Sequence, residues 1–188
     1  MYACGMRLYR RTQFGNPILR TPSKILSKQD VLSKQTQELL SNMQYTLEKR
    51  KYGIGLAAPQ VGRGIAVVVI GLKPTPTRPN VEKLDMIIIN PKITELYGKA
   101  TGMWEGCISG SELYGKAVRY KKIRLSWLDE KAQHHEKDFS GLIAQVIQHE
   151  VDHLNGILFV DRVKDTRTYT TFSEYKKLRK VENKKNKV

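Results

Sequence analysis

A broad apolar face between Ser140 and Leu154 constrains the fold of this chain more than any other feature. The segment repeats apolar residues at helical spacing, and they cover more than the narrow stripe of a surface helix. These residues are Leu142, Ile143, Val146, Ile147 and Leu154. Ser140 is a plausible N-cap, and Asn155-Gly156 is a typical helix exit. We therefore expect a helix that is buried in the middle of a domain.

Other segments predict strands around this helix. The runs Ile65–Ile70 and Met86–Asn90 are typical of buried strands, and Ala117–Leu128 alternates in part. A second helix is predicted from Asp30, as its cap, to Lys51, because apolar residues recur there at helical spacing. The fold class expected is α+β, with mixed or antiparallel strands packed around a central helix.

The length and charge of the chain indicate one domain with a basic tail. With 188 residues the chain is the size of an ordinary domain, which we place at residues 1–171. Residues 172–188 form the basic tail, for which a helix and a solvated end are the two alternatives. The net charge of +15 favours a polyanionic partner such as nucleic acid or the ribosome, or an anionic membrane surface.

The cysteine count argues against a disulfide scaffold. Only Cys4 and Cys107 occur, and two reduced cysteines are the simpler expectation in a cytosolic compartment. No stretch approaches the ~20 apolar residues of a membrane span. The N-terminus is basic and poor in acidic residues up to Asp30, which leaves an organellar transit peptide as an alternative to a bacterial cytoplasmic location.

The central helix carries the pattern His149-Glu150-x-x-His153. Residues four apart lie on one face of a helix, so both imidazoles can bind one metal ion. Glu150 can then act as a general base on a water at the metal. The alternative is a pair of histidines on a wet or satisfied face, without metal. The periodic apolar residues upstream favour the helix and therefore the metal site.

A catalytic site of this type needs a third protein ligand and an open position for water. Cys107, within Glu105-Gly-Cys-Ile-Ser109, is the outstanding candidate, although free cysteines are usually small buried hydrophobes. The segment Gly53-Ile-Gly-Leu-Ala-Ala-Pro-Gln60 predicts a close approach of main chain, and Gln60 could donate to a developing oxyanion. Taken alone, this segment also fits a plain Gly/Pro turn.

Together the three segments resemble the signature motifs of the peptide deformylase family, in the family's order and with similar gaps. Two flanking segments, Phe14-Gly-Asn-Pro-Ile-Leu-Arg20 and Asn155-Gly-Ile-Leu-Phe159, are also similar to the family. The resemblance extends from about Phe14 to Val163. It implies the deformylase fold, with the strands packed around a metal-binding helix.

The resemblance also implies the roles of individual residues. Cys107, His149 and His153 would be the metal ligands, with Fe²⁺ as the native ion and Zn²⁺, Ni²⁺ or Co²⁺ also accepted. Glu150 would be the general acid and base. The remaining roles fall to Gln60 and the backbone N–H of Ile108, which would stabilise the oxyanion, and to Gly55, which would bind the substrate backbone. The substrate would be a nascent chain that begins with N-formylmethionine, and formate would be released.

Two positions depart from the family pattern. An arginine that often helps to bind the peptide backbone is Tyr114 here, and an arginine often found shortly before the histidine motif is Gln145. Neither position is a metal ligand. The departures therefore concern substrate positioning, and with it efficiency and peptide preference.

Two other functions compete with this interpretation. A metallopeptidase would take its third ligand downstream of the helix, where Asp161 and Glu174 are the nearest carboxylates. A basic nucleic-acid-binding protein with a closed structural zinc would need a fourth ligand from Cys4, His134 or His135. Neither explains Cys107 and Glu150 together. The tail is either a ribosome-binding helix or a solvated end.

Overall fold

The computed structural model of the chain describes residues 5–50, 53–75 and 81–185, with side chains described as far as residue 180. Cys4 and Lys51 lie outside the described residues. The helices are α1 (Lys28–Leu32), α2 (Lys34–Glu48), α3 (Gly141–Leu154) and α4 (Phe172–Lys185). Short 3₁₀ turns cover Pro17–Arg20, Ala58–Val61, Phe159–Arg162 and Thr166–Thr168. The fold is α+β, as predicted.

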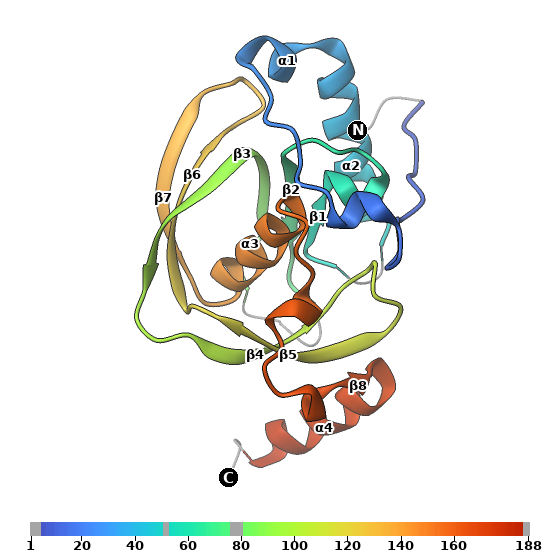
Figure 1. Cartoon of the computed structure of the whole chain (residues 1–188), viewed down its shortest axis with the longest axis vertical. Helices are drawn as coiled ribbons and strands as arrows, with labels where there is room; N and C mark the ends of the chain where they lie inside the picture. Colours follow the sequence, from blue (N-terminus) through green and yellow to red (C-terminus); the bar gives the residue numbers. More distant parts are fainter. Residues whose placement is uncertain (1–4, 51–52, 76–80, 186–188) are drawn as a thin grey trace.

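The strands form two antiparallel sheets. The five-stranded sheet has the order β1-β2-β3-β6-β7, and the three-stranded sheet has the order β4-β5-β8. Their bounds are β1 Gly55–Ala57, β2 Val67–Leu72, β3 Leu84–Tyr97, β4 Thr101–Gly106, β5 Leu113–Arg119, β6 Lys122–Leu128, β7 His134–Ser140 and β8 Thr170–Thr171. The first half of β3 pairs with β2 and its second half with β6, so the larger sheet curves around α3 (Figure 1).

The alternation of side chains along β2 builds one core on each face of the larger sheet. Val67 and Val69 pack with α2 residues such as Leu40 on one face. Val68 and Ile70 pack with Ile147 of α3 on the other face. Successive side chains of a strand point to opposite faces, so a strand buried on both faces is apolar throughout. This arrangement confirms α3 as the central helix.

Three sequence-based boundaries were wrong. The helix predicted from Asp30 is two helices, because Ser33 has extended backbone and its side chain caps α2. Asp30 is not the cap of the first one: Ser27 is, and Asp30 bonds back to it in a capping box. The segment Ala117–Leu128 is likewise two strands, β5 and β6, separated at residues 120–121.

The ends of α3 agree with the prediction in position. Ser140 occupies the N-cap, although its side chain makes no capping hydrogen bond, and Asn155 is the C-cap. Gly156 has a φ of +71°, and a Cβ there would lie 2.7 Å from the carbonyl carbon of Arg20. Only glycine fits this conformation without strain. The exit of α3 is thereby fixed against the N-terminal part of the chain.

Candidate metal centre and active site

Helix α3 carries three of the predicted functional residues. His149 and His153 are one helical turn apart, and Glu150 lies beside the first of them. His153 is fully buried and Glu150 is only 4% exposed. Such burial of polar side chains is expensive unless each one has a partner or a ligand.

Cys107 completes a cluster with the two histidines. It follows the last residue of β4, and its Sγ lies 3.2 Å from Nε2 of His153. The three ligand atoms all lie within 4.8 Å of one another. Ligand bonds of about 2.0–2.3 Å place two ligands of one tetrahedral ion roughly 3.3–3.8 Å apart. The cluster therefore has nearly the spacing that a single divalent metal ion requires.

The donor set also fits a catalytic metal ion. One thiolate and two imidazoles suit zinc, ferrous iron and related ions. In the part of the chain that the structure describes, this group has three ligands, as in a catalytic site with an open position. His134 and His135 are bound elsewhere, to Ser126 and Asp129. The described residues thus supply no fourth ligand for a closed structural zinc site.

The ring of His149 is oriented by a buried carboxylate. Its Nδ1 lies 2.9 Å from Oε2 of Glu105, so Nε2 is left for the metal. Burial alone would raise the pKa of Glu105, but hydrogen bonds from His149 and Arg119 outweigh it and hold the pKa at about 2. Glu105 is therefore ionised, and it fixes the orientation of the His149 ring within the cluster.

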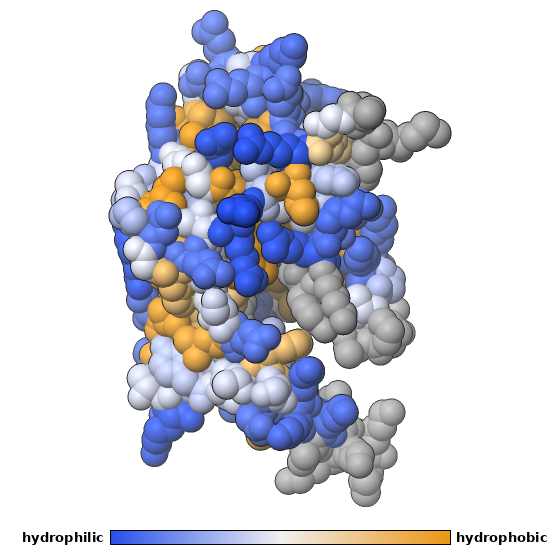
Figure 2. All heavy atoms as spheres, turned by 90° about the vertical axis from the view of Figure 1, so that its right-hand side faces the viewer, coloured by the Kyte–Doolittle hydropathy of each residue, from blue (hydrophilic) through white to orange (hydrophobic). Residues whose placement is uncertain are grey.

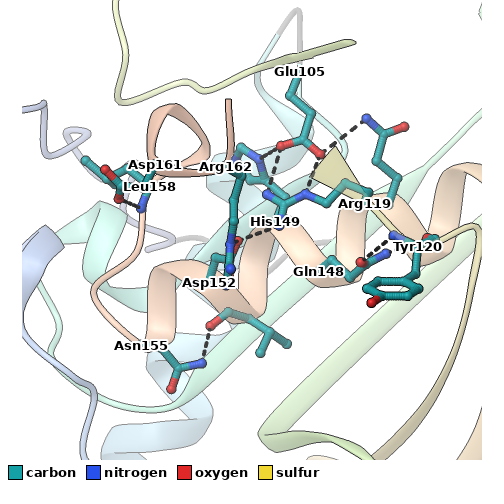
Figure 3. Close-up of polar contacts among 12 residues, drawn as sticks. Glu105, Arg119, Tyr120, Gln148, His149, Asp152, Asn155, Leu158, Asp161 and Arg162 are labelled. Carbon is teal, nitrogen blue, oxygen red and sulfur yellow. Dashed lines mark hydrogen bonds and ion pairs between the residues drawn. The ribbon is translucent and has the colours of Figure 1, made fainter. Parts of the chain in front are cut away.

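A buried arginine joins this carboxylate to a second one. Arg119 of β5 donates from Nε and Nη2 to Glu105, at 2.8 and 3.0 Å, and from Nη1 to Asp152 of α3 (Figure 3). Arg162 donates to Asp152 from the solvent side, at 2.7 Å. Sequence reasoning missed this network. Glu105 and Asp152 both lie within the motifs. Because histidines that bind a metal are commonly paired with carboxylates, these two acidic residues were the signal that could have predicted the network.

Glu150 lies against the backbone of β1. A Cβ added to Gly55 would lie 2.7 Å from Cδ of Glu150, so a side chain at this position would displace the carboxylate. Burial raises the pKa of Glu150 to about 7, and its Oε2 has no hydrogen-bond partner among the described residues. A carboxylate in this state is suited to accepting and releasing a proton near neutral pH.

Gln60 has its amide held in one orientation. Its Oε1 accepts from the N–H of Ala57 at 2.8 Å, and Nε2 lies 3.4 Å from Sγ of Cys107. The N-terminal segment ties the two neighbouring loops together, because Thr12 N–H donates to Gln60 O and Phe14 N–H donates to Ser109 O. The amide nitrogen of Gln60 therefore faces the metal cluster from a rigid support.

The two departures from the family pattern have different surroundings. Tyr114 stacks on Tyr175 of α4, with 4.5 Å between ring centroids, and its ring fills the space that a side chain on Gly106 would need. Gln145 donates to the carbonyl of Trp104 at 2.9 Å and toward Glu105 at 3.3 Å. Tyr114 thus anchors α4, and Gln145 contributes to the hold on Glu105.

Comparison with known proteins decides the family. The model of the polypeptide deformylase family matches residues 9–169. The chain belongs to the peptide deformylase family. It is therefore a metal-dependent hydrolase that removes the formyl group from the N-terminal formylmethionine of nascent polypeptides and releases formate. No helix in the described part of the chain has the length and apolarity needed to cross a membrane.

Bacterial deformylases resemble the chain over most of its length. A peptide deformylase of Leptospira biflexa is 39% identical over 171 residues, which cover 87% of this chain and 92% of that protein. A class I type b deformylase of Acinetobacter baumannii, solved with Met-Ala-Ser bound, has a TM-score of 0.78 and 31% identity, and it covers 84% of this chain and 99% of its own. The deformylase of Thermotoga maritima has a TM-score of 0.72 and the same identity, covering 85% and 99%.

Proposed function

We propose that Cys107, His149 and His153 hold the divalent metal ion of this deformylase, and that Glu150 moves the proton. The observation that carries the proposal is the convergence of the three ligand atoms within 4.8 Å, beside the buried carboxylate of Glu150. A metallopeptidase is less well supported, because its third ligand would come from downstream, whereas Cys107 precedes α3.

The peptide is proposed to bind along β1. This strand is at the edge of the five-stranded sheet, with β2 on one side only, so an extended peptide can add to its other edge. Gly55 lets that peptide approach the backbone closely. Half-buried apolar side chains border this edge, including Ile54 and, on α3, Val146, one turn before Glu150. They suit the unbranched side chain of methionine.

The residues divide the reaction between them. Cys107, His149 and His153 would hold the divalent metal ion, which would supply Lewis-acid polarisation of the formyl carbonyl and a water molecule of lowered pKa. Glu150 accepts a proton from the water that attacks the formyl carbon, and passes it to the amine nitrogen as the C–N bond breaks. The amide of Gln60 and the backbone N–H of Ile108 donate to the carbonyl oxygen as negative charge develops there. Formate and a free amino terminus leave.

The test is formate release from formyl-Met-Ala-Ser by protein purified without oxygen and loaded with Fe²⁺, which we propose as the native ion. We expect turnover with Fe²⁺, and also with Zn²⁺, Ni²⁺ or Co²⁺, since the donor set accepts all four. Metal analysis of the purified protein should give one ion per chain. The acetylated peptide is the control. A metal-loaded protein that releases no formate would contradict the proposed site.

We also propose that α4 binds the ribosome in the bacterial cytoplasm, where nascent chains are made. The described part of α4 exposes Lys176, Lys177, Arg179 and Lys180. Lysines and arginines that meet phosphates make binding sensitive to salt, with a slope of roughly 0.7–0.9 per phosphate. Phe172 and Tyr175 of the same helix do not belong to this basic surface, because their rings stack on Tyr114.

Cosedimentation with ribosomes tests this partner. Replacing Lys177 and Lys180 with glutamine should weaken binding and reduce its salt slope by about 1–2 units. The substitutions are preferable to truncation after Thr171, which would also remove the rings that pack on Tyr114. The matched control replaces Lys34 and Lys99, which lie outside α4, in the same way. Equal binding by both double variants would exclude α4 as the docking element.

A further inference from the structure

The three-stranded sheet lies between the metal-binding helix and α4. Glu105 of β4 is on the face of this sheet toward α3, where its carboxylate bonds to His149. Its neighbours in the strand, Trp104 and Gly106, belong to the opposite face, because successive residues of a strand alternate. Figure 1 shows α4 beyond this sheet, on the side away from α3. Side chains between the sheet and α4 therefore support β4, the strand that ends beside Cys107, from its outer face.

The ring of Tyr114 lies on the backbone of Gly106. The two residues are partners in the register between β4 and β5. A Cβ on Gly106 would lie only 2.5 Å from Cζ of Tyr114, so a side chain at this position would displace the ring. Gly106 directly precedes Cys107 in the chain. The contact with the ring therefore restrains the backbone one residue before the metal ligand.

Two rings of α4 hold the ring of Tyr114 from the other side. The ring centroid of Tyr175 lies 4.5 Å from that of Tyr114, and the ring centroid of Phe172 lies 5.4 Å from it. Tyr175 also contacts Trp104 of β4, with 5.4 Å between the centroids. Aromatic pairs at these distances attract each other beyond the effect of burial alone. In Figure 2, mostly blue and white side chains cover the lower end of the molecule, where α4 lies, so the helix turns its rings inward.

The turn between Cys107 and β5 is strained, and the start of α4 holds it. Ser111 has a φ of +43° and Glu112 a φ of +67°, which is left-handed backbone that residues other than glycine rarely adopt. The N–H of Phe172 donates to the carbonyl of Glu112 at 2.9 Å. Strained backbone of this kind persists only where its surroundings hold it. Phe172 thus supports both the ring of Tyr114 and the turn that follows the metal ligand.

Given the metal site proposed above, we propose that Tyr114 is a positioning residue for Cys107, and that α4 keeps its ring in place. The ring restrains the chain before Cys107, and the turn held by Phe172 restrains the chain after it. Sγ of Cys107 is thereby kept 3.2 Å from Nε2 of His153, close to the spacing of two ligands on one ion. The position where the family pattern often has an arginine for the substrate thus serves the metal site from the outer face of the sheet.

Metal binding by ring variants tests this role. Tyr114→Leu should weaken the affinity for Co²⁺, measured against a competing chelator, by about tenfold, the size of effect typical of groups that orient a metal ligand. The absorption bands of the cobalt-loaded protein that arise from sulfur-to-metal charge transfer should shift in the same variant. Tyr175→Leu, which removes only the support of the ring, should weaken the affinity by about three- to fivefold.

Conservative and matched variants serve as controls. Tyr114→Phe keeps the stacked ring, and its affinity and absorption bands should be those of the parent protein. Tyr97→Leu removes a ring of β3 outside this aromatic layer and should also change neither quantity. With formyl-Met-Ala-Ser as substrate, Tyr114→Leu should lower kcat and leave KM unchanged, because the ring acts on the metal ligand and does not touch the peptide.

Three results would overturn the positioning role. Tyr114→Leu could melt at a lower temperature with unchanged affinity and absorption bands, which would reduce the ring to a role in stability. It could raise KM with unchanged bands, which would make Tyr114 a peptide contact. Should Tyr114→Leu fail to fold, Tyr175→Leu decides, and parental affinity and bands in that variant would count against the proposal.

Cys107→Ala separates this inference from the proposed metal site. The variant should lose the sulfur-to-cobalt bands. If the bands persisted, Cys107 would not be the metal ligand, and the proposed site would fail together with the role of Tyr114. Loss of the bands in Cys107→Ala, with parental bands in Tyr114→Leu and Tyr175→Leu, would overturn the positioning role alone and leave the metal site intact.

Discussion

Replacing Glu150 with glutamine should reduce kcat by about 10²–10⁴-fold, while the protein still binds one metal ion per chain. Glutamine has nearly the same shape as glutamate and fits against Gly55, but it cannot accept the proton of the attacking water. Because Glu150 is not one of the three ligands, metal content should not change. The measurement is formate release from formyl-Met-Ala-Ser, with metal analysis of the same sample.

The physical basis of this prediction is the position of Glu150. The carboxylate is buried and packed against the backbone of Gly55, where the peptide is proposed to bind. Glu174, an exposed residue of α4, provides the matched control: Glu174→Gln removes the same charge and should leave kcat as it is. If Glu150→Gln turned over within a few-fold of the parent protein, Glu150 would not be the proton carrier, and another group would have to be.

The sequence predicted those parts of the site that lie on one regular element or next to it. A 14-residue helix with a continuous apolar face places His149 and His153 on one side by geometry alone. The third ligand required an argument from chemistry, because Cys107 and His153 are 46 residues apart and nothing local brings them together. In the structure the two sheets pack so that Cys107 and His153 lie next to each other, as the motifs suggested.

The sequence could not predict the residues that support the ligands. Arg119 lies in β5, which the sequence pattern joins to β6 in one predicted strand, because the partial alternation of apolar and aromatic residues spans residues 120–121. A strand break that rests on a change of partner strand leaves little local signal. The same limit applies to Tyr114: its departure from the family pattern was visible, but its stacking on α4 depends on where the tail packs.

At the break between α1 and α2, a helix-capping serine competes with the helical pattern of apolar residues. The apolar spacing continues through Ser33, so periodicity alone predicts one helix. Ser33 instead adopts extended backbone, and its hydroxyl bonds to the N–H of Thr36. Serine competes for backbone hydrogen bonds in this way and favours caps over helix interiors. The pattern of apolar residues therefore identified the buried face correctly and missed the boundary.

The second large effect concerns stability. Arg119→Met should lower the free energy of unfolding by about 3–5 kcal/mol, because Glu105 and Asp152 would remain buried without their shared cation. Arg119 is 3% exposed, and the two carboxylates are 6% exposed each. For a chain of this size, the loss corresponds to a fall in melting temperature of roughly 6–20 °C. Denaturant titration of zinc-loaded protein at neutral pH measures it, with equal metal concentrations for both proteins.

A surface pair and a double variant show what the network contributes. Arg124 binds Asp138 at 2.8 Å, but its side chain is 38% exposed and the pair is screened by solvent, so Arg124→Met should cost much less stability than Arg119→Met. Glu105→Gln in the Arg119→Met background removes one stranded charge, and it should recover part of the stability without restoring metal affinity, since His149 then loses its carboxylate. If Arg119→Met were as mild as Arg124→Met, Arg162 and solvent would be sufficient to compensate Asp152 and Glu105. Arg119 would then not be what holds the β5 strand to the metal helix.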